Sequence, residues 1–160
     1  MKIEIFPISS EFDQPLANII KTVGAEFGAI GEGFGPSDAE VNNMSRYYQS
    51  ENKSGYWIAT LNGQLMGGGG IAPFNGSHSL CELKKLFLLP ESRGYGIGKA
   101  IVEQCLSFAQ QQGFTQCYLD TLSTMESAIH LYQTLGFTLL SEPMLGTEHN
   151  GCDVWMIKTF

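Results

Sequence analysis

Basic residues are scarce in this chain: nine Lys and Arg stand against sixteen Asp and Glu, for a formal net charge of −7. An acidic surface repels phosphate backbones, so the composition disfavours nucleic acid and anionic membranes as partners. Cationic molecules such as amines suit this surface better.

Targeting, membrane and metal-binding patterns are also missing. Met1–Ile8 is short and contains Glu4 and Pro7, unlike a signal peptide. No window approaches the roughly 18 apolar residues of a membrane span. The cysteines show no CxxC spacing, and scattered cysteines of this kind are usually reduced core residues; they are Cys81, Cys105, Cys117 and Cys152. We therefore expect a cytoplasmic protein without metal.

The chain does contain enough apolar material for a core. With 160 residues, of which 43% are hydrophobic, it fits a single domain spanning residues 1–160. Residue periodicity in the first half predicts a strand, two helices, a hairpin with an Asn62-Gly63 turn and a further strand. Their ranges are Lys2–Ile8, Phe12–Phe27, Ser37 or Asp38 toward Gln49, Tyr56–Leu61 with Gln64–Pro73, and Ser79–Leu89.

The second half alternates helices with strands. An apolar stripe from Ile97 to Ala109 predicts a helix that ends at Gly113, and Thr115–Thr121 follows as a strand. Ser123-Thr124-Met125-Glu126 has the form of a capping box that would begin the next helix. Phe137–Leu140 and Cys152–Phe160 are closing strands. This order predicts an α+β domain with a mixed, mainly antiparallel seven-strand sheet and about four helices.

A glycine-rich segment, Arg93-Gly94-Tyr95-Gly96-Ile97-Gly98-Lys99, follows a strand and opens a helix. Backbone N–H groups and the positive helix end converge there, an arrangement that stabilises an anion. The Walker spacing fails, because Arg93 precedes Gly98 by five and Ala100 follows Lys99. The dinucleotide fingerprint fails because it would require glycine at Lys99. Arg-x-x-Gly-x-Gly remains, and an ordinary helix-capping turn is the alternative.

At these residues the chain resembles the GNAT (Gcn5-related) acetyltransferases, whose pyrophosphate loop has that pattern. Leu86-Phe87-Leu88-Leu89-Pro90 is similar to the central strand of that family, and Leu131–Phe137 is similar to its Leu-Tyr-x-x-Leu-Gly-Phe segment. The resemblance implies that acetyl-CoA binds as co-substrate and needs no metal. Its contacts would be the backbone of Leu86, Phe87 and Leu88 and the loop Arg93, Gly94, Tyr95, Gly96, Ile97, Gly98 and Lys99.

The resemblance also implies roles in the helix that follows. Many members carry asparagine seven residues before the helix tyrosine, where this chain has Met125, which can pack against the ligand but offers no amide. Tyr132 would protonate the departing thiolate as a general acid. Its place on the apolar stripe of the helix makes a plain core tyrosine the alternative.

Two carboxylates are candidates for the general base that an alkylammonium acceptor needs. Glu82 lies on the central strand, where some members place such a group. Asp120 ends the next strand, at the position of a glutamate in the ribosomal-protein N-terminal acetyltransferases. Either could instead form a salt bridge, for example with Lys84 or Lys85, and water without a dedicated base is a third possibility.

Two clusters have no assigned chemistry. His149, Cys152 and Asp153 lack a fourth ligand for zinc, so we expect them to border the acceptor pocket. Gly67–Gly70 places four glycines in a strand, which indicates a bulge or the close approach of another group, and the acceptor is one candidate for that group.

The predicted function is N-acetyl transfer from acetyl-CoA to a small-molecule or peptide amine, by direct attack in a ternary complex. A homodimer is compatible with it. The alternative is a catalytically silent acyl-CoA-binding module, which would keep the loop and lose the proton-transfer groups. Polyamine, amino acid, antibiotic, peptide N-terminus and non-amine acceptors all stay open.

Overall fold

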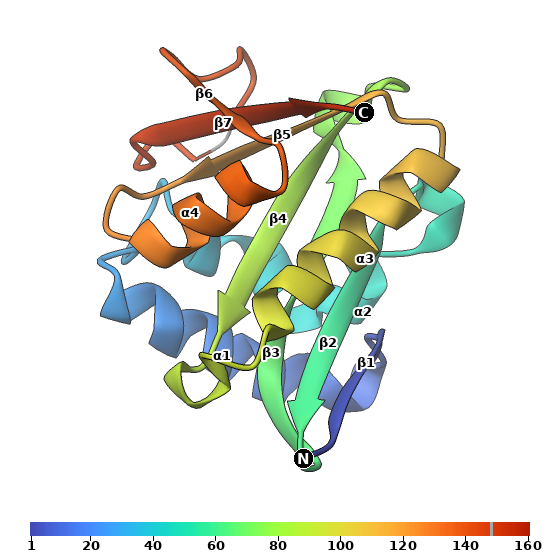
Figure 1. Ribbon diagram of the computed structural model, residues 1–160, viewed down its shortest axis with the longest axis vertical. Coiled ribbons are helices and arrows are strands. Elements are labelled where there is room, and N and C mark those ends of the chain that lie inside the picture. The colour runs from blue at the N-terminus through green and yellow to red at the C-terminus, as the bar shows by residue number, and fades with distance from the viewer. Residues whose placement is uncertain (148) are drawn as a thin grey trace.

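The computed structural model describes residues 1–147 and 149–160, and it contains the predicted seven-stranded sheet (Figure 1). The strand order is β1-β2-β3-β4-β5-β7-β6, and only the β4–β5 pair is parallel. The strands are β1 (Ile3–Pro7), β2 (Gly55–Leu61), β3 (Gln64–Pro73), β4 (Leu80–Leu88), β5 (Gln116–Thr121), β6 (Thr138–Leu140) and β7 (Val154–Thr159). The α+β prediction is confirmed.

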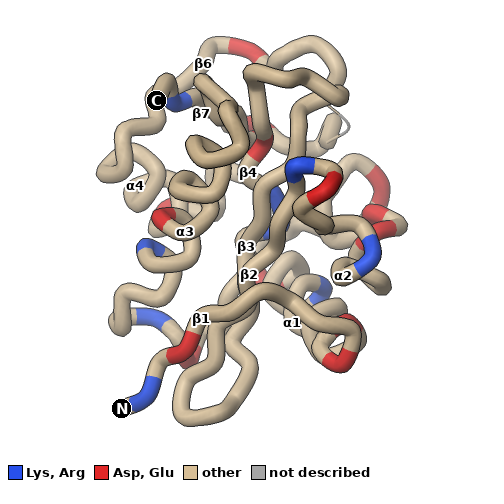
Figure 2. The backbone as a smooth tube through the Cα atoms, turned by 90° about the vertical axis from the view of Figure 1, so that its right-hand side faces the viewer, with Lys and Arg blue, Asp and Glu red and all other residues tan. Residues whose placement is uncertain are grey.

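Helices cover both faces of the sheet, so the molecule has three layers (Figure 2). The helices are α1 (Asp13–Glu26), α2 (Met44–Tyr47), α3 (Ile97–Gln111) and α4 (Glu126–Thr134). On one face α3 and α4 pack around Ile101, Leu119 and Tyr132. On the other, α1 and α2 pack around Leu16 and Tyr56. Among the described residues, no helix has both the length and the apolar character to cross a membrane.

The predicted second helix is mostly absent. Residues 35–37 and 39–43 form short 3-10 turns, and α2 has only four residues. The turn before α2 leaves helical geometry at Asn43, whose φ is −143°. Asp38 and Glu40 pair with Lys85 and Lys84 of β4 instead of facing water. These tertiary contacts override the local helical preference.

The four glycines of β3 accommodate the protein's own atoms. A Cβ at Gly67 would collide with the carbonyl oxygen of Phe87, and one at Gly68 would collide with that of Trp57. At Gly70 it would meet the ring of Tyr56. The expected close approach is therefore real, but the approaching groups are neighbouring strands. The protein's own atoms therefore account for these glycines without an acceptor.

A β-bulge in β4 decides which side chains share a face. Gly68 pairs with Phe87 and Gly70 with Lys84, so Lys85 and Leu86 together oppose Gly69. Lys85 has a left-handed φ of 56°. The extra residue breaks the period of two. As a result Glu82, Lys84 and Phe87 lie toward α1, while Leu86 packs in the core on the α3 side.

Candidate functional site

The site begins where β4 and β5 separate. The two parallel strands pair only from Leu80↔Gln116 to Glu82↔Tyr118. Beyond that point β4 continues to Leu88 along β3, while β5 pairs with β7 as far as Thr121. The backbone groups of β4 that face this gap have no strand partner there. An exposed strand edge of this kind can bind an extended ligand.

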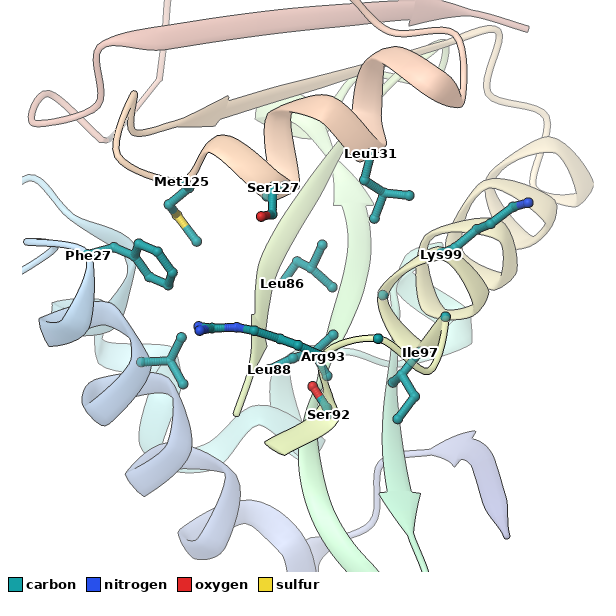
Figure 3. Close-up of a pocket in the computed structure, with 15 residues that line it drawn as sticks. Phe27, Leu86, Leu88, Ser92, Arg93, Ile97, Lys99, Met125, Ser127 and Leu131 are labelled. Carbon is teal, nitrogen blue, oxygen red and sulfur yellow. The ribbon is translucent and has the colours of Figure 1, made fainter. Parts of the chain in front are cut away.

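A cavity of about 380 Å³, here called the large cavity, opens at this gap (Figure 3). It lies between β4, the start of α3, the start of α4 and the end of α1. Most residues predicted to contact acetyl-CoA line it: Leu86, Leu88, Arg93, Gly94, Gly96, Ile97, Gly98, Lys99 and Met125. Lining residues that the sequence analysis missed are Val23, Phe27, Ser92, Ser127, Ala128 and Leu131.

Two of the predicted residues lie outside the large cavity. Phe87 is buried on the other face of the sheet because of the bulge, and its side chain lines a different cavity. Tyr95 is an exposed loop residue. Phe87 therefore offers only its backbone to a ligand in the large cavity.

The glycine loop presents free backbone donors to the large cavity. Gly94 and Gly96 have φ values of 88° and 75°, which a residue with a Cβ adopts only at a cost. The first helical hydrogen bond of α3 runs from the N–H of Ala100 to the carbonyl of Gly96 at 3.1 Å. Within the described chain, the N–H groups of residues 94–99 donate to no protein acceptor. Unsatisfied donors at a helix start fit an anion such as the diphosphate of CoA.

Arg93 extends from the loop toward the end of α1 (Figure 3), and its side chain remains half exposed. Its guanidinium donates to Glu26 of α1 at 2.8 Å and lies over the ring of Phe27, 5.6 Å from the ring centroid. The side chain thereby links the loop to the end of α1. It places a permanent positive charge on the lining of the large cavity.

The start of α4 differs from the predicted capping box. Ser123 donates its N–H and its hydroxyl to the carboxylate of Asp153, both at 2.8 Å. Thr124 donates to the carbonyl of Phe27 at 2.7 Å, and no side chain caps the helix after Met125. Contacts with Asp153, just before β7, and with Phe27, at the end of α1, thus fix the segment. A local sequence pattern does not reveal such contacts. Free N–H groups at this helix start also face the large cavity.

A second, smaller cavity of about 60 Å³, here called the narrow cavity, lies on the other side of Met125. Met125 lines both cavities, and Glu82, Asp120, His149 and Cys152 line the narrow one. His149 and Cys152 thus line a cavity, while their expected place at the acceptor pocket stays a prediction. Asp153 instead holds Ser123.

Glu82 has the environment of a base. Among the described residues its carboxylate has neither a hydrogen bond nor an ion pair, although Lys84 and Lys85 are close in sequence. Burial, reinforced by the negative charge of Asp120, raises the pKa of Glu82 to about 7, and Lys84 only partly opposes this. Such a carboxyl exchanges a proton near neutral pH.

Asp120 is committed to other partners. It accepts a hydrogen bond from the Thr147 hydroxyl and lies 2.9 Å from Nδ1 of His149. Nε2 of His149 lies 2.7 Å from Asp38, 111 residues away. Burial alone would lower the pKa of His149, but the hydrogen bonds with Asp120 and Asp38 raise it to about 9. The imidazole is therefore a cation that joins two carboxylates at neutral pH.

Two lysines of β4 complete the ionic network. Lys85, whose side chain is 1% exposed, lies 2.7 Å from Asp38 and 3.6 Å from Glu40. Lys84 lies 3.0 Å from Glu40. Burial works against the charge of Asp38, yet His149 and Lys85 lower its pKa to about 2. We call the charged side chains of this region the charged cluster: Asp38, Glu40, Glu82, Lys84, Lys85, Asp120 and His149.

Part of this cluster has the composition of a metal site. Glu82, Asp120 and His149 each bring one ligand atom within 4.8 Å of the others. Metal ligation requires a neutral imidazole with a free lone pair. Both nitrogens of His149 already face carboxylates, and its raised pKa keeps it protonated. The trio therefore fits an ion-pair network better than a metal.

Tyr132 is buried on α4. Its ring lies 5.8 Å from that of Phe137, in the core beside Cys105 and Cys117. Burial raises the pKa of its phenol, so the O–H stays protonated at neutral pH. The side chain is not among those that line the large cavity.

Comparisons with known proteins agree with this geometry. The model of the acetyltransferase (GNAT) family matches residues 26–137. An Escherichia coli protein, named uncharacterized N-acetyltransferase YjgM, is 36% identical over 149 residues, which cover 91% of this chain and 89% of that protein. Further curated N-acetyltransferases are 32–36% identical, and the chain spans only 44–61% of their length.

Solved structures share the whole fold. A GNAT acetyltransferase from Staphylococcus aureus superposes with a TM-score of 0.84 at 20% identity, covering 99% of both chains. PaiA N-acetyltransferase from Thermoplasma acidophilum, solved with coenzyme A, gives 0.78 at 21% identity over 100% of both chains. At these identities the likeness concerns the fold.

Proposed function

The chain belongs to the GNAT acetyltransferase family and is an acetyl-CoA-dependent acyltransferase, and from this premise we propose that it acetylates a small primary amine. The observation that carries the proposal is that two cavities meet at Met125, which lines both of them. On one side lie the anion-binding loop and the free edge of β4. On the other lies the unpaired carboxylate of Glu82.

Acetyl-CoA would occupy the large cavity. The free N–H groups of residues 94–99 suit its diphosphate, with Arg93 adding positive charge. Leu86 and Leu88 would offer backbone groups to its pantetheine arm, and Met125 would pack against it where other members have asparagine. When bound, acetyl-CoA supplies the thioester carbon that the amine attacks.

Glu82 is the better of the two candidate bases. Asp120 is occupied by His149 and Thr147, whereas Glu82 has no protein partner in the described chain and a pKa of about 7. Glu82 accepts a proton from the ammonium, and the nitrogen lone pair then forms the C–N bond as the C–S bond breaks. Tyr132 would donate its phenol proton to the sulfur, and the second proton lost by the nitrogen would restore that phenol, so that the proton held by Glu82 is the one released. CoA leaves as a thiol, and one proton is released per turnover.

Holding both substrates in one gap of the sheet favours direct transfer, because the nitrogen and the thioester need no separate encounter. Within the charged cluster, Asp120 is hydrogen-bonded to His149. Asp120 therefore does not compete with Glu82 for the proton of the amine. A single domain, a cytoplasmic location and a homodimer stay predictions.

The test combines binding with turnover. Acetyl-CoA should raise the melting temperature, whereas ATP and NAD should not, because the loop lacks both of their spacings. A panel of primary amines should then release CoA. Protection by ATP without protection by acetyl-CoA would overturn the proposed cofactor site. Binding of acetyl-CoA without CoA release by any amine would contradict amine acetylation.

A further inference from the structure

A third cavity of about 210 Å³, here called the polar cavity, adjoins the narrow one. The two share Glu82, Lys84 and His149. The remaining walls come from residues 73–76 after β3 and from Gly146 and Thr147 in the loop before β7. The three cavities therefore follow one another from the CoA loop to the far side of Glu82.

Size assigns different parts of an acceptor to the two cavities beyond Met125. The narrow cavity, at about 60 Å³, has room for the reacting end of a molecule only. The polar cavity is more than three times larger, at about 210 Å³. The amine would thus reach past Glu82 toward Met125, while the body of the acceptor stays in the polar cavity.

Only some side chains of the charged cluster line the polar cavity. Glu82, Lys84 and His149 line it. Asp38, Glu40 and Asp120, the counterions of the two cations, do not line it. A ligand in this cavity therefore meets two positive groups and one negative group.

These groups differ in what they can still bind. Both nitrogens of His149 are used by Asp120 and Asp38. The Lys84 ammonium has three hydrogens, and its one recorded protein partner is Glu40, at 3.0 Å. Glu82 has no protein partner among the described residues. Glu82 can thus still bind a cation, and Lys84 can still bind an anion. They lie two residues apart on one face of β4, about 7 Å along the strand.

We infer that the acceptor is a small zwitterion of the free amino acid class, with its amine at Glu82 and its carboxylate at Lys84. This inference rests on the proposed function and narrows it. A polyamine would bring a second positive charge against Lys84 and His149. A peptide N-terminus would offer Lys84 an amide in place of a carboxylate.

The experiment compares three matched acceptors by CoA release: an amino acid, its amide and the amine that lacks the carboxyl group. The set is built on whichever of the common amino acids is acetylated fastest. We expect kcat/KM for the amino acid to exceed that for each analogue by about 10- to 100-fold, the range of one hydrogen bond between charged groups. Equal rates for all three would overturn the inference and leave amine acetylation intact.

Variants of Lys84 make the assignment specific. Because Lys84 also lowers the pKa of Glu82, Lys84→Met is judged by the ratio of the two acceptors: kcat/KM for the amino acid relative to that for the plain amine should fall by about 10- to 100-fold. Lys84→Arg should restore the preference, since it keeps the charge. Lys21→Met, on the exposed face of α1, is the control and should change nothing.

Folding is checked by acetyl-CoA, because Lys84 lies outside the large cavity. Stabilisation of Lys84→Met by acetyl-CoA shows that the variant is intact, so that a retained preference for the amino acid would overturn the role of Lys84. Failure of every primary amine, with acetyl-CoA still bound, would overturn the proposed function together with the inference.

Discussion

The glycine loop at residues 93–99 and the charged cluster around Glu82 lie toward opposite ends of one gap in the sheet, and they are built differently. The loop offers backbone N–H groups, held in place by glycines of positive φ at the start of α3. The cluster offers side chains from several distant segments. A backbone site leaves a contiguous motif, whereas a side-chain site depends on tertiary packing.

The largest expected effect is the loss of the base. Glu82→Gln keeps the shape of the side chain but accepts no proton, so kcat/KM should fall by about 10²- to 10⁴-fold at neutral pH. The affinity for acetyl-CoA should stay unchanged, because Glu82 is not in the large cavity. Steady-state kinetics and calorimetry separate the two quantities.

The pH profile sharpens this test. Glu82 is active as a carboxylate and its pKa is about 7, so kcat/KM should rise with pH and level off above that value. The residual activity of Glu82→Gln should not show this rise with pH. If the variant kept the same rise of kcat/KM, the titrating group would be another residue or the substrate amine.

Removal of the proposed acid should have a somewhat smaller effect. Tyr132→Phe keeps the ring contact with Phe137 and removes only the O–H, so we expect kcat and kcat/KM to fall together by about 10²-fold. Tyr56→Phe is the matched control, because that buried phenol donates to the carbonyl of Lys85 at 2.7 Å. It should lower stability and spare turnover. Wild-type turnover in Tyr132→Phe would make Tyr132 a core residue.

The difference between the two regions also explains what the sequence could predict. The hairpin turn, α1, α3 and most strands follow from periodicity and from Asn62-Gly63. The loop residues follow from a motif. Phe27 and Leu131 enter the large cavity only because α1 and α4 converge on it, and no local pattern indicates that convergence.

The charged cluster depends on two features that are invisible in the sequence. The bulge at Lys85 shifts the alternation of β4, which otherwise would place Glu82 and Lys84 on the face of Leu86. His149 and Asp38 meet across 111 residues because the loop before β7 folds onto the turns before α2. Asp38 was considered only as a helix cap, since no pattern links it to β4.

Stability at different pH values tests whether His149 holds the cluster together. Its pKa rises from 6.5 to about 9 on folding, so its contribution is fully present below pH 6.5 and is lost as pH rises through 9. His149→Gln should therefore lower the free energy of unfolding by a few kcal/mol, on the order of the pKa shift, at pH 6. Above about pH 9.5 the two proteins should converge.

Thermal melts at several pH values make this measurement. His130→Gln, at an exposed position of α4, is the control and should be neutral throughout. A constant difference between His149→Gln and the wild type at every pH would indicate that His149 stabilises the protein by packing alone.

At the other end of the gap, Gly96→Val should weaken acetyl-CoA binding by about tenfold or more. No atom lies within 4 Å of a Cβ at Gly96, but its φ of 75° strains a β-branched residue and displaces the donors of the loop. Gly113→Val is a matched control, since Gly113 ends the same helix with φ 92° and equally open surroundings. Both variants should lose similar stability, and only Gly96→Val should lose affinity.

The smallest expected effect concerns the ion pair between Arg93 and Glu26. The side chains are 51% and 37% exposed, so solvent screens the pair and its loss should change the melting temperature little. Glu26 nevertheless competes with any anion in the large cavity for the guanidinium. Glu26→Gln should therefore strengthen acetyl-CoA binding by about two- to fivefold at low salt, with the gain fading as ionic strength rises.

The salt dependence distinguishes this competition from a change in shape. Arg93→Gln should weaken binding in the same salt-dependent way, and adding Glu26→Gln to it should then have no further effect, because the residue they compete for is gone. Additive effects of the two substitutions would contradict the competition. They would show that Glu26 repels the bound anion directly, without acting through the guanidinium of Arg93.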